Sequence, residues 1–277
     1  MLAATDLVMC TGTVRGVDFA TKARAASKAG FDAISIRPAE YDNLVARGWS
    51  AGDIRSFLAE LGLGVAELDP VMTWLPGTEA PPGMHAVDTV LAIARALRPD
   101  CVSVLVPVDA PLHLGEATVA FAALCDRAAD DGMRMAIEFF AWSPLCSLSD
   151  TWTIVRDADR ANGGIILDTW HHARRGGTAD DIALVDAARI WGVQIADAPT
   201  RPVLDDLAAE CRHHRRWPGE GELPLDAIVQ ALRAGGCRAP LSIEVFGDAT
   251  DIADATVRAQ RARLALRTVI DPARPRP

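Results

Sequence analysis

Residues 164–177 read GIILDTWHHARRGG, and the change of character within this stretch indicates the architecture of the chain. After the leading glycine the first residues are apolar, as in a strand that is buried on both faces of a parallel sheet. Asp168 ends this run, and His171 follows three residues later. An acid and a histidine at the exit of a buried strand indicate either a capped loop or a metal or catalytic site.

Short apolar runs of the same kind recur along the chain, with helical patterns between them. We expect strands at residues 7–12, 31–37, 64–69, 101–107, 133–139, 164–168, 191–197 and 241–246. We expect helices, marked by capping residues and closing glycines, at 18–30, 50–62, 149–163, 178–190 and 224–236. This alternation predicts an α/β fold, a single (β/α)8 TIM barrel. An open doubly wound sheet is the alternative, although no G-x-G-x-x-G motif follows the first strand.

The predicted barrel accounts for residues 1–277 as one domain, because α/β barrels of about 250 residues are common. Its longest connection, residues 198–224, follows the seventh strand. Long connections after barrel strands are usually lids or substrate loops, so we interpret 198–224 as an active-site loop. Residues 268–277 are interpreted as a C-terminal tail.

Composition argues against several classes of function. The formal net charge of −9 argues against a nucleic-acid partner, which requires a basic face. No apolar run is as long as a membrane span, and the first residues lack the basic and apolar regions of a signal peptide. The six cysteines are scattered without a C-x-x-C pair, which predicts reduced thiols and a cytoplasmic location. A small-molecule substrate is the expected partner, and association into a homo-oligomer is left open.

The lysines argue against further kinds of chemistry. Lys22 and Lys28 are the only lysines, and both lie in TKARAASKAG (21–30), which has the pattern of a surface helix. Schiff-base aldolases and pyridoxal-phosphate enzymes need a lysine amine in the active site. A phosphate-binding P-loop needs Gly-Lys-Ser/Thr. We therefore expect none of these activities.

Four predicted strands carry a polar side chain at their carboxyl end, where a barrel enzyme builds its active site. These side chains are Glu138, Asp168, Gln194 and Glu244. A carboxyl group in an apolar run is costly to bury without a partner, and a shared metal ion would explain all four residues at once. Carboxylate and amide oxygens favour Mg²⁺ or Mn²⁺. Each residue alone also fits a cap, a turn or a paired core side chain, and Asp197 equally fits a turn.

Several stretches in the second half of the chain resemble the xylose-isomerase-like TIM barrels. These stretches are IEFFAW (137–142), LDTWHHARRGG (167–177), VQIADAP (193–199), HHRRWPGEGELPL (213–225) and APLSIEVF (239–246). The superfamily contains sugar isomerases and epimerases, endonuclease IV relatives, inosose dehydratases and 3-dehydroshikimate dehydratases. The resemblance implies one divalent metal ion, held by Glu138, Asp168, Gln194 and Glu244. It also implies that Glu138 and Glu244 are the catalytic carboxyl groups.

The resemblance also implies contacts with the substrate. His171 is expected to bind the substrate or to move a proton, whereas His172 is expected to be structural. In the seventh loop Arg215 is the best match to a substrate-binding arginine, with alternatives that are Arg212, His213 and Arg216. A solvated basic loop stays open as an interpretation of this stretch. Further candidates for lining the pocket are Arg37, Trp142, Glu67 and Asp69.

Three functions are compatible with these residues. We favour a divalent-metal-dependent isomerase or epimerase that abstracts a proton next to the carbonyl of a sugar-like or polyhydroxylated keto substrate. The second is a lyase that dehydrates a cyclic keto-polyol such as 3-dehydroshikimate, and the third is a catalytically silent barrel that acts as a binding partner. The amide of Gln194 stands where many sugar epimerases have a histidine, as in some dehydratases. However, some of those dehydratases carry a histidine just after the fifth-strand glutamate, where this chain has Phe139 and Phe140.

Overall fold

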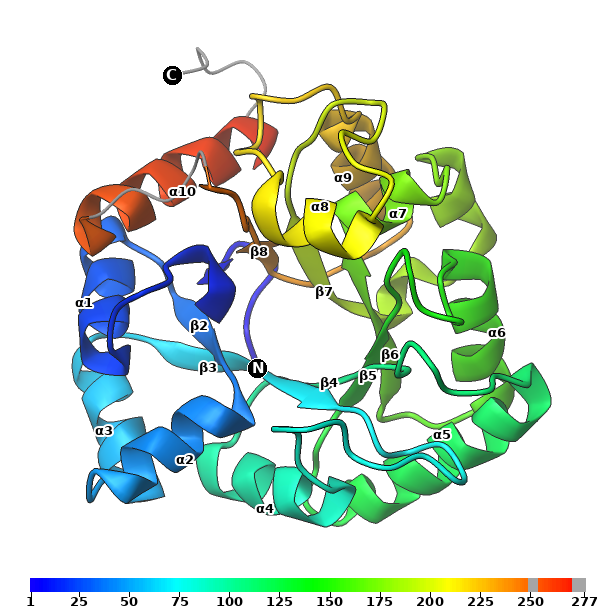
Figure 1. Cartoon of the computed structure of the whole chain (residues 1–277), viewed down its shortest axis with the longest axis horizontal. Helices are drawn as coiled ribbons and strands as arrows, with labels where there is room; N and C mark the ends of the chain where they lie inside the picture. Colours follow the sequence, from blue (N-terminus) through cyan, green and yellow to red (C-terminus); the bar gives the residue numbers. More distant parts are fainter. Residues whose placement is uncertain (249–253, 271–277) are drawn as a thin grey trace.

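Parallel strands form a closed sheet in a computed structural model that describes residues 1–248 and 254–270. Within these residues eight strands pair in chain order, and the last strand pairs with the first. Figure 1 shows the strands at the centre, inside a ring of helices. The strands are β1 (Leu7–Met9), β2 (Ala33–Ile36), β3 (Gly64–Val71), β4 (Cys101–Val104), β5 (Met135–Glu138), β6 (Gly163–Asp168), β7 (Ile190–Ile195) and β8 (Leu241–Ile243). The predicted TIM barrel is confirmed.

Each strand is followed in sequence by at least one α-helix, and most of the helices form a ring outside the strands (Figure 1). They are α1 (Phe19–Ala29), α2 (Pro38–Ala46), α3 (Ala51–Glu60), α4 (Val87–Leu97), α5 (Leu114–Ala129), α6 (Leu148–Ala158), α7 (Thr169–Arg174), α8 (Leu207–His213), α9 (Leu225–Ala234) and α10 (Ala255–Ile270). Short 3₁₀ helices occupy Thr11–Thr13, Asp180–Leu184 and Ala187–Arg189. None of the helices described here is long and apolar enough to cross a membrane.

Local capping signals fix most helix ends where the sequence predicts them. The Asp18 carboxylate accepts the Thr21 N–H at the start of α1, and Gly30 closes that helix with φ 84°. Two expectations are wrong. The helix predicted at 149–163 is capped by Ser147 and ends at Asp159, which takes the left-handed conformation before Asn162-Gly163 is reached. The pattern at 178–190 forms only two 3₁₀ turns, although Thr178 does bond Asp181 as a capping pair would.

Alternate residues of each strand belong to two different parts of the core. Ile137, Leu167 and Ile243 belong to one large cluster that includes the apolar faces of the helices. Their neighbours Ala136 and Ile166 belong to a separate small cluster, because alternate side chains of a barrel strand face the barrel axis. The six cysteines are all free thiols, as predicted, and all except Cys146 are buried.

The connection after β7 is more ordered than the sequence indicates. It contains helix α8, which is capped by Asp206. Outside this helix, Asp197 fixes the backbone of the connection. The Asp197 carboxylate accepts backbone N–H groups of Ala198, Gly219, Gly221 and Leu223 at 2.8–3.1 Å. A Cβ at Gly221 would lie 2.1 Å from that carboxylate, so the position requires glycine. Asp197 therefore anchors the loop. This agrees with its interpretation as a turn residue.

Residues 268–270, predicted as part of a C-terminal tail, belong to α10, and residues 271–277 lie outside the described part of the chain.

A buried ion pair attaches the seventh loop to the barrel. Arg174 at the end of α7 donates to Glu210 of α8 at 2.6 Å and 2.9 Å, and neither side chain is more than 1% exposed. Arg174 also donates to the carbonyl of Pro199, and the second oxygen of Glu210 accepts the N–H of Val203. Because both charges are removed from water, the loss of either partner leaves an uncompensated charge.

We expect Glu210→Ala to lower the free energy of unfolding by about 3–5 kcal/mol, because Arg174 would remain buried without its carboxylate. The matched control is Asp131→Ala, which breaks a surface pair with Arg95 and should lower the free energy of unfolding far less, because water screens this pair. Urea denaturation followed by circular dichroism measures both. Equal losses in the two variants would contradict the anchoring role of the buried pair.

Candidate active site

A cleft of about 670 Å³ opens at the carboxyl ends of the strands. Glu138 reaches it from the end of β5, and Glu244 reaches it from the residue after β8. His171 of α7 and Arg215 of the seventh loop line the same cleft. The structure therefore brings together residues that are more than 100 positions apart in sequence, at the end of the barrel where this fold places active sites.

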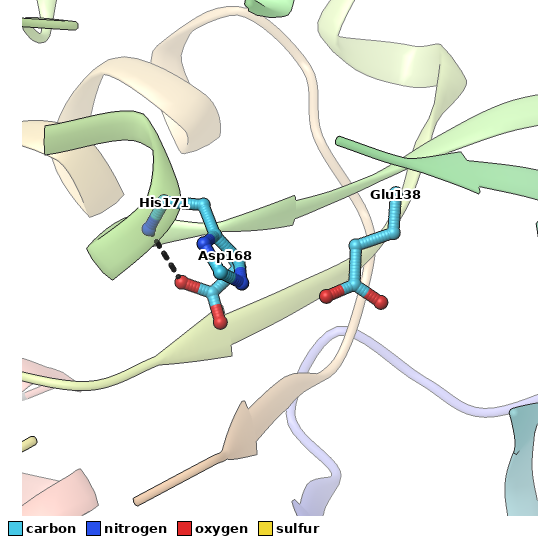
Figure 2. A group of neighbouring side chains, drawn as sticks. All are labelled: Glu138, Asp168 and His171. Carbon is cyan, nitrogen blue, oxygen red and sulfur yellow. Dashed lines mark hydrogen bonds between the residues drawn. The ribbon is translucent and has the colours of Figure 1, made fainter. Parts of the chain in front are cut away.

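Three of the predicted site residues form a tight group. One possible ligand atom from each of Glu138, Asp168 and His171 lies within 4.8 Å of the others. Figure 2 shows the carboxyl group of Glu138 pointing toward Asp168 from the neighbouring strand, and the dashed line marks the bond from the His171 N–H to Asp168. Asp168 caps α7 through this bond of 2.9 Å. The two interpretations of Asp168, as a cap and as a site residue, are thus compatible with each other.

Arg215 compensates two of the acids. Its side chain is fully buried, and Nη1 lies 2.6 Å from Asp168 Oδ2 and 3.3 Å from Glu244 Oε2. Burial alone would raise the pKa of Asp168, but the guanidinium of Arg215 holds it below its usual value. Although burial opposes the charge of Arg215, Asp168 raises the pKa of Arg215 above its usual value. Arg215 and Asp168 therefore both stay ionised. Each oxygen of Asp168 accepts one bond, which leaves a further lone pair on each.

Glu138 has no such compensation. Among residues 1–248 and 254–270 it forms no ion pair, and its hydrogen bond is a long one of 3.4 Å from the hydroxyl of Ser103. Burial and then repulsion from Glu244 raise the pKa of Glu138 well above its usual value. Burial also raises the pKa of Glu244, and Arg215 offsets this only in part. The site therefore has more buried acid than nearby positive charge.

Gln194 and Glu67 lie beneath this group and do not line the cleft. Gln194 is opposite Asp168 in the register of β6 and β7. Its Nε2 donates to Glu67 at 3.1 Å, whereas its buried Oε1 has no hydrogen-bond partner among the described residues. Burial raises the pKa of Glu67 to about 7. Glu67 is thus placed below the site, away from the surface where we expected it to contact substrate.

His171 is buried among aromatic rings. Trp142 and Trp170 each lie 5.1 Å from it, measured between ring centroids, and Phe140 lies 5.9 Å away. Burial lowers the pKa of His171 to about 3, although Asp168 opposes the shift, so the ring is neutral near pH 7. Its Nε2 is 3.2 Å from Arg215, and Nδ1 is 3.3 Å from the N–H of Ala141. A neutral imidazole accepts at only one of these nitrogens.

Other predicted residues line the cleft or support it. Trp142, Arg37, Asp69, Arg212 and His213 line the cleft. Arg37 lies 3.8 Å from Asp69. The remaining two are outside it: Arg216 donates to the carbonyl of Glu220, and His172 is buried with Nε2 2.9 Å from the carbonyl of Thr178. His172 therefore has a packing role, as expected.

Lys22 also lines the cleft, contrary to expectation. Its ammonium is buried in the wall of the cleft, where it donates hydrogen bonds to Glu40 and to the hydroxyl oxygen of Thr11. The expectation that both lysines lie on a surface helix is wrong for Lys22, so lysine position does not exclude Schiff-base chemistry. The helical spacing contained the signal, because Lys22 shares an inward face with Phe19, Ala23 and Ala26.

Two oxygen donors, one lining the cleft and one buried outside its lining, fit a divalent cation. The carboxyl group of Glu138 is buried without a cation, and Gln194 Oε1 is buried without a donor. Both are hard oxygen atoms, which bind Mg²⁺ or Mn²⁺ well. A metal ion would satisfy both groups, which are otherwise costly to bury.

Two characterised enzymes are similar to this chain in sequence. The protein named 3-dehydroshikimate dehydratase from Pseudomonas aeruginosa is 33% identical over 234 residues, which are 82% of this chain and 36% of that protein. The inosose isomerase of Bacillus subtilis is 30% identical over 128 residues, 44% of each chain. The chain thus spans about a third of the length of the dehydratase relative.

A solved structure agrees along almost the whole barrel. The IolI protein, whose crystal structure contains a bound zinc atom, superposes with a TM-score of 0.83 and 20% identity over 97% of this chain and 99% of that one. The model of the xylose isomerase-like TIM barrel family matches residues 23–268. This chain belongs to the xylose isomerase-like TIM barrel family.

Proposed function

We propose that the chain is a divalent-metal-dependent lyase that dehydrates a carboxylated cyclic keto-polyol of the 3-dehydroshikimate kind. The observation that carries this proposal is the separation of charge in the cleft. Glu138 and Glu244 are acids of the inner site, whereas Arg37 and Arg212 lie where the cleft meets a second chamber of about 400 Å³. Such a cleft suits a ring that has a ketone and hydroxyls at one end and a carboxylate at the other.

Arg212 is the arginine best suited to the carboxylate. Lys22 is already paired with Glu40, and Arg37 lies beside Asp69. Arg212 is exposed and has no acidic partner among residues 1–248 and 254–270. A guanidinium group binds a carboxylate through two parallel hydrogen bonds, so it both attracts and orients an anionic ring.

The proposed metal ion, Mg²⁺ or Mn²⁺, would be held by residues of four neighbouring strands, which are Glu138, Asp168, Gln194 and Glu244. When bound, it would polarise the substrate carbonyl and stabilise negative charge on the oxygen. The relative IolI is a zinc-bound protein, and a nitrogen ligand such as His171 would suit zinc. The oxygen-rich donor set favours the harder cations for this chain.

The chemistry begins with a proton transfer. Glu138 and Glu244 line the cleft from two different strands, so either carboxylate can take a proton from the carbon next to the carbonyl. The hydroxyl on the following carbon then leaves as water, and keto–enol tautomerisation makes the ring of a 3-dehydroshikimate aromatic. His171 is neutral near pH 7, so it can hydrogen-bond a substrate oxygen without adding a charge. The dehydratase relative supports this outcome.

Isomerisation or epimerisation of a neutral keto-polyol is the second candidate. The first proton transfer is the same, and the two carboxyl groups can return the proton to another position or face. The relative named inosose isomerase supports this candidate over a shorter stretch of the chain. It gives no role to Arg212, which has no acidic partner among the described residues, because an inosose carries no charge for a guanidinium group to bind.

Incubation with 3-dehydroshikimate and Mn²⁺ separates these functions. We expect ultraviolet absorbance from an aromatic product, and we expect the chelator EDTA to abolish it. If inososes instead incorporate solvent deuterium and no aromatic product forms, the isomerase is the correct function. Failure to bind any divalent metal would favour a catalytically silent barrel.

We expect Glu244→Gln to lower kcat/KM for the dehydration by about 10²–10⁴-fold, because the amide cannot accept a proton. The matched control is Glu116→Gln on the exposed start of α5, which should keep full activity. Steady-state kinetics measure both, with circular dichroism to show that each variant is folded. Full activity and full metal content in Glu244→Gln would contradict the assignment of the site.

We expect Arg212→Gln to raise KM for a carboxylated substrate roughly tenfold while kcat changes little, because the arginine contacts a part of the ring that does not react. The control is Arg216→Gln, a neighbouring exposed arginine that donates to Glu220 and does not line the cleft. An unchanged KM in Arg212→Gln would remove the charge-separation argument for a carboxylated substrate.

A further inference from the structure

Glu67 reaches across the interior of the barrel to one residue of the proposed metal site. It lies on β3, and Gln194 lies on β7, four strands away in a closed sheet of eight (Figure 1). The Glu67 carboxyl group nevertheless accepts a hydrogen bond of 3.1 Å from Gln194 Nε2. The two side chains are 3% and 2% exposed, so water does not compete for this bond.

The space that Glu67 occupies depends on a missing side chain. A Cβ at Gly192 of β7 would lie 3.0 Å from Glu67 Oε1 and 3.1 Å from Ile166 Cγ1. Contacts this short require a neighbour to move, and the neighbours here are packed inside the barrel. Gly192 therefore leaves room for the carboxyl group of Glu67 directly below Gln194.

A carboxylate determines which way an amide is turned. The two ends of the Gln194 amide differ, because the NH₂ group only donates and the carbonyl oxygen only accepts. In the structure the NH₂ group faces Glu67, which accepts its hydrogen bond, so Oε1 at the other end of the amide faces away. Oε1 is the atom that is buried without a partner, and Gln194 stands opposite Asp168 in the register.

We propose that Glu67 is a positioning residue that fixes the amide of Gln194 with its oxygen toward the metal. This inference rests on the metal site of the proposed function. Glu67 does not line the cleft, so we do not expect it to contact the substrate. Glu67 acts through the orientation of one ligand, in the way that buried partners of metal ligands commonly set their geometry.

The test is Mn²⁺ binding measured by isothermal titration calorimetry, without substrate. We expect Glu67→Gln to weaken binding about 10–100-fold, because the new amide can also donate to Gln194 Oε1 and compete with the metal. Glu67→Gln changes little in volume, so circular dichroism should show a folded barrel. The matched control is Cys101→Ala, which changes the residue beside Glu67 in the register of β4 and should alter binding less than about twofold.

A double variant distinguishes an effect of Glu67 through the orientation of Gln194 from a direct effect of its charge on Mn²⁺ binding. If Glu67 acts through Gln194, then Glu67→Gln has no further effect on Mn²⁺ binding in a Gln194→Ala background. The inference is overturned if Glu67→Gln binds Mn²⁺ as tightly as the wild type, or if its effect is the same with and without Gln194. Absence of Mn²⁺ binding by the wild type would overturn the metal site itself, and the inference with it.

Discussion

Buried negative charge at the mouth of the barrel is the constraint on which the rest of the structure depends. Glu138, Asp168 and Glu244 are each less than 10% exposed, and burial of a carboxylate is costly unless a cation or hydrogen bonds compensate it. Arg215 compensates Asp168 and Glu244. Glu138 has no cation among the described residues, and this imbalance is what a divalent metal ion would correct.

The seventh loop carries Arg215 and is attached to the barrel by buried polar contacts. The backbone of the next residue, Arg216, pairs with Asp197, whose carboxylate accepts four N–H groups of the loop. The buried pair of Arg174 and Glu210 ties the helix of the same loop to α7, which also carries His171. The contacts that anchor the loop therefore also hold Arg215 in place to compensate the two acids. A looser loop would leave Asp168 and Glu244 without their cation.

The cleft is divided between two kinds of charge, and this division limits its substrates. The acids of the inner site suit a metal ion and the oxygens it would bind, and the guanidinium groups of Arg37 and Arg212 suit an anion. The named relatives include a dehydratase and an isomerase, so membership of the family alone leaves the reaction open. In the proposed function, Arg212 would favour a carboxylated ring over a neutral one, because a guanidinium group binds a carboxylate.

The amino-acid sequence alone predicts the barrel, the ends of α1, α3 and α9 and the residues at the strand ends, since these depend on local periodicity, capping and the common direction of parallel strands. It does not predict α2, α4, α5 or α10. It missed the inward position of Lys22 and the helix within the seventh loop. Only the tertiary structure decided that Arg215 joins Asp168 to Glu244 and that Glu67 lies beneath Gln194. These contacts join residues 29 to 127 positions apart, and their geometry follows from barrel closure, which no local pattern contains.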